Sequence, residues 1–209
     1  MIKILMINGS PVENSSCQLA LEKLAELTKE NIAPKADATI TNIDLNQLKF
    51  IPCQSCGKAP TPDFCFYDDD LTPIYKQIVE TDIFIIGSPI YFDGVSAQAK
   101  SFIDRCNCFR PADFKHEHPP YPFIKILGID KRPGAMILTG GKDAWFEGGR
   151  RTIVGLFKWI EVENCATITY CSDDFNTIGT ILSDNQLLSE IKETSQLLAD
   201  RVTKASNET

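Results

Sequence analysis

Three cysteines stand close together in the segment IPCQSCGKAPTPDFCFYDDD, at Cys53, Cys56 and Cys65. The Cys-x-x-Cys spacing of the first two occurs both in metal sites and in redox-active thiol pairs. Zinc and iron–sulfur sites usually take four thiolates, and this segment supplies three. Three interpretations are therefore open: a metal or cluster site, a redox-active pair, or packed thiols in a loop beside another site.

A fourth ligand is not evident from the sequence. Cys106 and Cys108 lie at the end of another expected helix, and nothing in the sequence brings them near the cysteine segment. His116 and His118, in HEHPPYP, would complete a zinc set, but histidines in a proline-rich loop are more often solvated or pocket residues. We therefore expect no ordinary four-cysteine cluster, and the three loop cysteines remain candidate metal ligands.

The composition bounds the protein class. A chain of 209 residues with 43% hydrophobic and 23% charged residues is typical of one well-buried domain. A net charge of -7 and a pI of about 4.9 argue against a nucleic-acid partner. No apolar run reaches the ~20 residues that span a bilayer, and MIKILMING is interrupted too soon for a secretory signal. We expect a cytoplasmic protein with no membrane partner and mostly reduced cysteines.

Strands and helices are expected to alternate along the chain. Apolar or alternating patterns predict strands at 2–8, 38–45, 82–88, 133–141 and 165–171. Helical spacing of apolar residues predicts helices at 16–32, 71–80, 96–106, 145–160 and 183–202. This alternation predicts an α/β fold: a flavodoxin-like three-layer sandwich with a five-stranded parallel sheet in the order 2-1-3-4-5. We expect one domain over 1–205, with a cysteine-containing loop at 51–67, a long insertion at 107–132 and a frayed tail at 206–209.

Local signals refine the helix ends. Asp69 or Asp70 is expected to cap the second helix, and Ser96 the third. Lys100 and Asp104 have the i, i+4 spacing of an ion pair on a helix.

The first strand is followed by GSPVENSS, where Ser10, Asn14, Ser15 and Ser16 offer donors at a helix N-terminus. Such a terminus suits a phosphate, because its backbone N–H groups and partial positive charge point outward. The loop has no Lys or Arg and matches neither GxGxxG nor GxxxxGK[ST]. An ordinary capped strand-to-helix turn explains it equally well.

Two further loops should meet the first at the same sheet edge, where α/β proteins bind ligands. In GSPIYFDGVSAQ, Tyr91 and Phe92 offer aromatic surface for a planar ring, unless they fold back into the core. In LTGGKDAWFEGG, Gly140 and Gly141 allow close backbone approach, or form an ordinary turn. Together, a phosphate cradle, an aromatic surface and a glycine loop suit a mononucleotide with a flat ring, for which FMN is the natural candidate.

The succession NGSPxxNSS, the cysteine segment, DDD, DIFIIGSPIYFDGVSAQAKSFIDR and ILTGG resembles the flavodoxin-like NAD(P)H-dependent FMN reductases, and within them the iron–sulfur flavoprotein group. The resemblance runs from Met1 to about Gly141 and is tightest over 87–105. It implies FMN as cofactor, NAD(P)H as electron donor, a quinone, flavin or other small acceptor, and a homodimer or homotetramer. The residues that it assigns to FMN are Ser10, Asn14, Ser15, Ser16 and Cys17 around the phosphate, Ser88, Pro89, Ile90, Tyr91 and Phe92 beside the ring, and Thr139, Gly140 and Gly141 at its other edge.

The chain departs from the family pattern at two positions. Cys17 stands where the family often has a threonine that helps to bind phosphate, and a thiol is a weaker donor. Ala59 stands where the compact CxxCxxC motif of the iron–sulfur flavoproteins has its third cysteine, so the chain lacks one cluster cysteine.

The main hypothesis is an FMN-dependent oxidoreductase, with Tyr91 as the side chain most expected to touch the ring. Hydride transfer depends on orientation more than on a protein acid or base, so we name no catalytic side chain. An electron-transfer flavoprotein serving a protein partner is the alternative, since an acidic surface suits a basic partner. A thiol-based redox sensor without flavin is a third reading. Residues 125–151, where basic residues outnumber acidic ones, either attract the NAD(P)H phosphates or form a mixed solvated surface.

Overall fold

A five-stranded parallel sheet forms the centre of the molecule, in the order β2-β1-β3-β7-β8. The computed structural model describes residues 1–58, 64–111, 125–172 and 179–205. In chain order the strands of this sheet are β1 (Ile2–Asn8), β2 (Ala38–Asp44), β3 (Ile83–Tyr91), β7 (Arg132–Gly140) and β8 (Val162–Cys171). When only these strands are counted, the order is the expected flavodoxin-like 2-1-3-4-5, so the fold prediction is confirmed.

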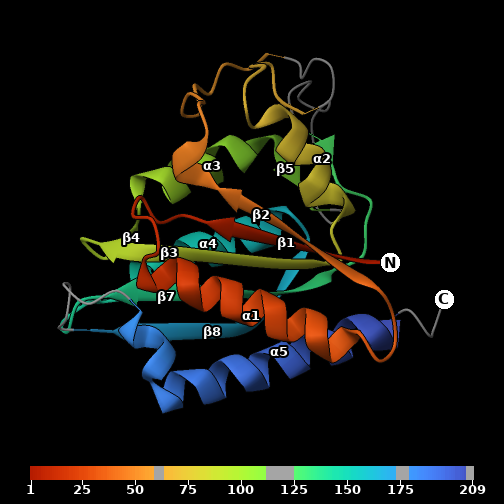
Figure 1. The fold of residues 1–209 in the computed structure, drawn as a ribbon. Helices are drawn as coiled ribbons and strands as arrows, with labels where there is room; N and C mark the ends of the chain where they lie inside the picture. Colours follow the sequence, from red (N-terminus) through yellow and green to blue (C-terminus); the bar gives the residue numbers. More distant parts are fainter. Residues whose placement is uncertain (59–63, 112–124, 173–178, 206–209) are drawn as a thin grey trace.

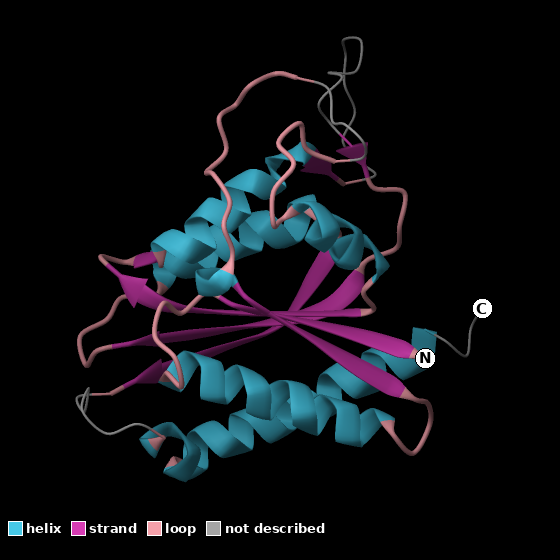
Figure 2. Ribbon diagram, turned by 45° about the horizontal axis from the view of Figure 1, so that its top comes forward, coloured by secondary structure: helices cyan, strands magenta, loops and turns pink. Residues whose placement is uncertain are grey.

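Helices cover both faces of the sheet, which gives the three expected layers (Figures 1 and 2). One face carries α1 (Ser16–Ile32) and α5 (Asn185–Ala205), drawn in orange and blue in Figure 1. The opposite face carries α2 (Thr72–Glu80), α3 (Ala97–Arg105) and α4 (Glu147–Trp159). Three short 3-10 turns are η1 (Leu45–Gln47), η2 (Cys106–Cys108) and η3 (Thr180–Ser183).

The burial of the strands explains their sequence patterns. β1, β3 and β7 are nearly continuous apolar runs because helices cover both of their faces. One hydrophobic cluster lies beneath α2, α3 and α4, and a second beneath α1 and α5. β2 and β8 are the edge strands and are only partly buried. β8 begins at Val162, before the expected Cys165, because Val162 already pairs with Arg132 of β7. The register shifts between Gly134 and Ala135, which leaves Cys165 in a bulge.

Short strands add to the expected elements. β3 extends beyond the expected Ser88 to Tyr91, because its end pairs with β4 (Gly94–Val95) in an antiparallel hairpin. Within the 107–132 insertion, β5 (Phe109–Arg110) and β6 (Lys125–Ile126) form a separate two-stranded parallel sheet. The rest of the insertion, with His116 and His118, lies outside the described residues, as do Ala59 and the tail from 206 to 209.

The helix-end signals were right for α3 and wrong for α2. Ser96 caps α3 by accepting a hydrogen bond from the Ala99 N–H, and Lys100 pairs with Asp104 at 2.7 Å. The expected cap of α2 by Asp69 or Asp70 is wrong: Leu71 is the cap residue, and it makes no side-chain cap bond. The carboxylates are used elsewhere, since that of Asp69 accepts the Leu71 N–H and that of Asp70 accepts the Lys49 N–H.

β1 and β3 approach each other closely just after β1 ends, at the middle of β3. The Gly9 N–H donates to the Gly87 carbonyl over 2.9 Å, and the Ser96 hydroxyl donates to the Gly9 carbonyl. A Cβ on Gly9 would lie 2.7 Å from the Gly87 carbonyl oxygen and 2.9 Å from the Cβ of Ala99. Glycine at position 9 therefore allows β1, β3 and α3 to meet at this edge.

Within the described residues, no helix is both long and apolar enough to cross a bilayer.

Replacing Gly9 with alanine is expected to destabilise the protein by about 1–3 kcal/mol, because the new methyl group would press on backbone that cannot move alone. Gly155→Ala is the matched control: this helical position has open space around it, so alanine should stabilise by about 0.5–1 kcal/mol. Urea unfolding followed by circular dichroism measures both changes. Equal midpoints for Gly9→Ala and the unmodified protein would show that the approach imposes no constraint.

Candidate functional site

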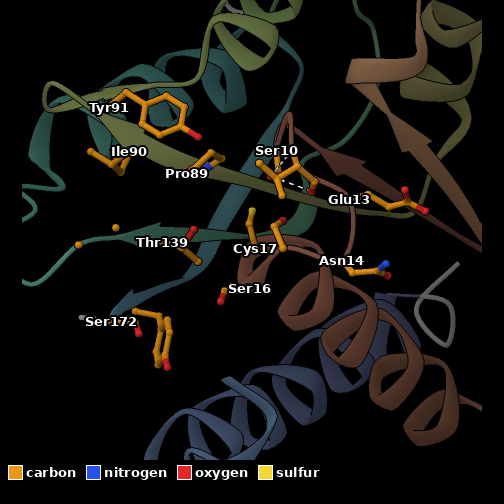
Figure 3. Close-up of a pocket in the computed structure, with 15 residues that line it drawn as sticks. Ser10, Glu13, Asn14, Ser16, Cys17, Pro89, Ile90, Tyr91, Thr139 and Ser172 are labelled. Atoms are coloured by element: carbon orange, nitrogen blue, oxygen red, sulfur yellow. Dashed lines mark hydrogen bonds between the residues drawn. The ribbon is translucent and has the colours of Figure 1, made fainter. Parts of the chain in front are cut away.

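A cavity of about 440 Å³ opens at the carboxyl edge of the sheet, beside the ends of β1, β3, β7 and β8 (Figure 3). Eleven of the residues predicted from the sequence line it: Ser10, Asn14, Ser15, Ser16, Cys17, Pro89, Ile90, Tyr91, Thr139, Gly140 and Gly141. The three loops that the sequence singled out therefore converge on one cavity, as the rule for parallel sheets requires.

The loop after β1 directs the N-terminus of α1 at this cavity. The Ser15 hydroxyl caps the helix by accepting the Gln18 N–H, and the Gln18 side chain in turn accepts the Asn14 N–H over 2.9 Å. Asn14 takes a left-handed conformation, with φ of 54°, which asparagine tolerates better than most residues. The first-turn N–H groups of Ser16 and Cys17 have no acceptor within the helix. Together with the Ser16 hydroxyl, they form a neutral site for an anion.

The Cys17 thiol forms part of the cavity wall and is uncharged at neutral pH. Burial raises the pKa of the Cys17 thiol to about 12, although a hydrogen bond with the Thr139 side chain acts in the opposite direction. Figure 3 draws Cys17 and Thr139 among the residues that line the cavity. Cys17 therefore joins α1 to the end of β7, and its backbone N–H is the group suited to an anion.

The end of β3 forms the apolar side of the cavity through Pro89, Ile90 and Tyr91, whose ring is about half exposed. Two neighbours with predicted site roles lie outside the lining. Ser88 is fully buried, and its hydroxyl donates to the Pro89 carbonyl and accepts the Ser96 N–H. Phe92 sits in the hairpin turn at a φ of 52° and is fully exposed. Ser88 thus supports the cavity from behind, and Phe92 lies at the tip of the hairpin.

Sequence reasoning missed four lining residues: Val12, Glu13, Tyr170 and Ser172. The first two stand in the same loop as the predicted serines, and treating the loop as a unit would have included them. Tyr170 and Ser172 follow from sheet order, because β8 lies beside β7 and its carboxyl end reaches the same edge. The Ser172 N–H donates to the Gly140 carbonyl over 3.0 Å, which fixes this contact.

Three basic residues of the 125–151 window are engaged within the protein. The half-buried Arg132 guanidinium donates to the carbonyls of Ile78, Val79, Thr81 and Ile160, at the ends of α2 and α4. Arg150 and Arg151 each pair with Glu147 at 2.7 Å. The window therefore contributes to helix ends and surface pairs, which favours the structural reading for these three side chains.

A second, smaller cavity of about 90 Å³ lies among the cysteines. Cys53, Cys56 and Cys65 line it, and so does Cys108, which η2 places at the end of α3. Burial raises the pKa of the Cys108 thiol to about 12, and the neighbouring Cys65 adds to the rise. The sequence placed only three thiols here, and the structure brings a fourth to the same cavity. All eight cysteines are free thiols.

Arg105 holds both ends of the cysteine segment against α3. Its buried guanidinium donates to the Ile51 carbonyl over 2.7 Å, to the Asp69 carboxylate over 2.7 Å and to the Tyr67 carbonyl over 3.4 Å. Ile51 precedes the cysteines and Tyr67 follows them. One side chain therefore fixes the position of the segment relative to the helix that leads to Cys108.

Comparisons with known proteins agree with the fold and the resemblance. The model of a family described as NADPH-dependent FMN reductase matches residues 2–163. An iron–sulfur flavoprotein of Methanosarcina thermophila is 26% identical over 168 residues, which is 80% of this chain and 77% of the relative. An iron–sulfur flavoprotein of Methanocaldococcus jannaschii is 34% identical over 110 residues, 52% of this chain and 54% of that protein, so about half of its length is matched. The solved structure of a flavone reductase superposes with a TM-score of 0.66 at 15% identity, and the match covers 100% of this chain and 65% of that chain. This comparison shows similarity of fold.

In the folded protein, iodoacetamide at about pH 8 is expected to modify the exposed Cys171 and leave Cys17 unmodified, because the thiolate is the reactive form. Peptide mass spectrometry after timed quenching measures both rates. In urea the two thiols should react alike, which controls for local sequence effects. Native labelling of Cys17 at the rate of Cys171 would contradict the buried, neutral thiol.

Proposed function

The chain belongs to the NADPH-dependent FMN reductase family, and from this membership and the cavity we propose that it is an FMN-binding oxidoreductase that accepts hydride from NAD(P)H. It then passes the electrons to a quinone, a flavin or another small acceptor. The observation that carries the proposal is the single cavity in which a helix N-terminus and an apolar strand end face one space.

The residues of the cavity suit FMN. The N–H groups of Ser16 and Cys17, with the Ser16 hydroxyl, would hold the phosphate by neutral hydrogen bonds and the helix dipole. The segment Pro89–Tyr91 would place the flat ring against apolar surface, and Thr139 to Gly141 would close its other edge. When bound, FMN supplies the ring that accepts hydride. The part of the chain is to hold and orient that ring, which is what hydride transfer requires of a protein.

The alternative is an electron-transfer flavoprotein that serves a protein partner and has no small substrate of its own. The net charge of -7 favours it, because an acidic surface attracts a basic partner. A thiol-based sensor without flavin is excluded if the purified protein is yellow with stoichiometric FMN. We also propose a single domain over 1–205, a cytoplasmic location and a homodimer or homotetramer, for which light scattering measures the assembly.

Stopped-flow absorbance separates the enzyme from the carrier. Mixing the FMN-loaded protein with NADH or NADPH under anaerobic conditions should bleach the flavin absorbance rapidly, since the proposal requires direct hydride transfer. A rate no faster than that of free FMN with the same nucleotide would support the carrier instead. The two nucleotides are run in parallel, and the faster one identifies the donor.

Tyr91→Ala is expected to weaken FMN binding by roughly two- to tenfold, the value of one aromatic contact, whereas Tyr91→Phe keeps the ring and should bind normally. Phe92→Ala is the matched control, because the adjacent Phe92 side chain lies outside the cavity lining. Quenching of FMN fluorescence by the apoprotein measures the affinity of each variant. Unchanged affinity and unchanged reduction in Tyr91→Ala would remove Tyr91 from the ring site.

A further inference from the structure

The hairpin of β3 and β4 carries Ile90 and Tyr91, which line one side of the larger cavity. Tyr91 pairs with Gly94, so only Phe92 and Asp93 form the turn, which Figure 1 draws in yellow-green at the left. We propose that Asp93 is a positioning residue for the ring of the bound cofactor: it holds this hairpin on the start of α4 and so sets the distance between two sides of the cavity. The inference rests on the proposed function, because the ring in question is that of FMN.

The turn has a backbone conformation that its own residues do not favour. Phe92 and Asp93 have φ angles of 52° and 61°. Two-residue turns with a positive φ at both positions usually contain Asn and Gly, and a bulky side chain is strained there. The Phe92 side chain is fully exposed, so its own packing does not compensate for the strain. Such a conformation persists where neighbouring structure fixes it, so the constraint comes from contact between the turn and another element.

The start of α4 supplies that contact. The Asp93 carboxylate accepts the Gly148 N–H over 3.1 Å, and its negative charge lies at the positive end of the helix. Phe146, the cap residue of α4, makes no side-chain cap bond, so the first turn takes its acceptor from the hairpin instead. A Cβ on Gly148 would overlap the Asp93 carbonyl oxygen, and a Cβ on Gly149 would overlap the Ile90 side chain. These two glycines therefore allow the hairpin and the helix to lie in direct contact.

The same helix start is joined to the opposite side of the cavity. The segment that leads from β7 into α4 begins with Gly140 and Gly141, which line the cavity. The Ala144 N–H donates to the Gly141 carbonyl over 3.0 Å, and a Cβ on Gly140 would overlap that of Ala144 and lie 3.5 Å from the Phe146 ring. The hydrogen bond between Asp93 and α4 therefore links the two sides between which the flat ring would lie.

Replacing Asp93 with glycine separates positioning from folding. Glycine adopts a positive φ freely, so relief of strain should offset the lost hydrogen bond and keep the thermal midpoint within about 3 °C. The Kd for FMN should rise by about three- to tenfold, because the cavity is no longer preorganised. Asp93→Asn keeps an oxygen that can accept the Gly148 N–H and tolerates a positive φ, so it should bind FMN within about twofold of the unmodified protein. Quenching of FMN fluorescence by the full-length apoprotein measures each Kd.

A second pair of variants tests the contact from the helix side. In Gly148→Ala the new methyl group would press on the backbone of the hairpin, and FMN affinity should fall at least about threefold. Gly155→Ala adds the same methyl group to the same helix, where it meets open space, and should leave FMN affinity unchanged. The visible circular dichroism of bound FMN, which depends on the orientation of the ring, should change in Asp93→Gly and Gly148→Ala and be restored in Asp93→Asn.

One measurement requires no cofactor. In the apoprotein, hydrogen exchange of the Gly148 N–H, followed by NMR, should be at least about twofold faster in Asp93→Gly than in the unmodified protein. An unchanged exchange rate would show that Asp93 does not hold α4.

Failure of this inference and failure of the proposed function give different results. An unmodified protein that does not bind FMN would contradict the proposed function, even if the exchange rate of Gly148 responds as expected. If the unmodified protein binds FMN, equal affinity and equal circular dichroism in Asp93→Gly would overturn the role of Asp93 alone. Weaker binding that Asp93→Asn fails to restore would also overturn it, because the hydrogen bond would then not be the cause.

Discussion

The close contact between Gly9 and Gly87 is the constraint on which the functional edge of the molecule depends. It extends the pairing of β1 with β3 one residue past the end of β1, to the middle of β3, and the Ser96 hydroxyl donates to the Gly9 carbonyl at the start of α3. The loop that points α1 at the larger cavity begins there. α3 also begins there and carries, at its far end, Arg105 and the turn with Cys108. One short helix therefore connects the cavity proposed for flavin with the cavity formed by the thiols.

The fold was predictable because its strongest signals are local and uniform. Three central strands are apolar on both faces, and the amphipathic helices between them leave few arrangements when crossovers are right-handed. The capped start of α1 was predictable for the same reason, because the Ser15 hydroxyl acts within one helix turn. Parallel strand ends must meet at one edge, so the convergence of three loops on the larger cavity follows from strand order alone.

The features that the sequence did not reveal depend on contacts between distant segments. Whether Ser88 faces the cavity depends on the N–H of Ser96, and nothing at position 88 indicates that bond. Asp69 looked like a helix cap, yet its carboxylate is held by Arg105, which lies 36 positions further along. Cys108 lines the same cavity as the loop thiols, and the hydrogen bonds of that same arginine hold the segment beside α3. Polar and thiol groups have several possible partners, and tertiary packing selects among them.

The loop before α1 and its first turn, residues 9–17, contain no Lys or Arg. This determines how binding of the proposed phosphate would respond to ionic strength. A phosphate monoester approaching a chain of net charge -7 is repelled at long range, and salt screens that repulsion beyond a Debye length of about 8 Å in physiological conditions. In the proposed site, a bound phosphate would be held by N–H groups in direct contact with it, where salt screens the interaction much less. Added salt would therefore speed the capture of the cofactor and leave its residence time almost unchanged, the reverse of what a lysine- or arginine-lined site would show.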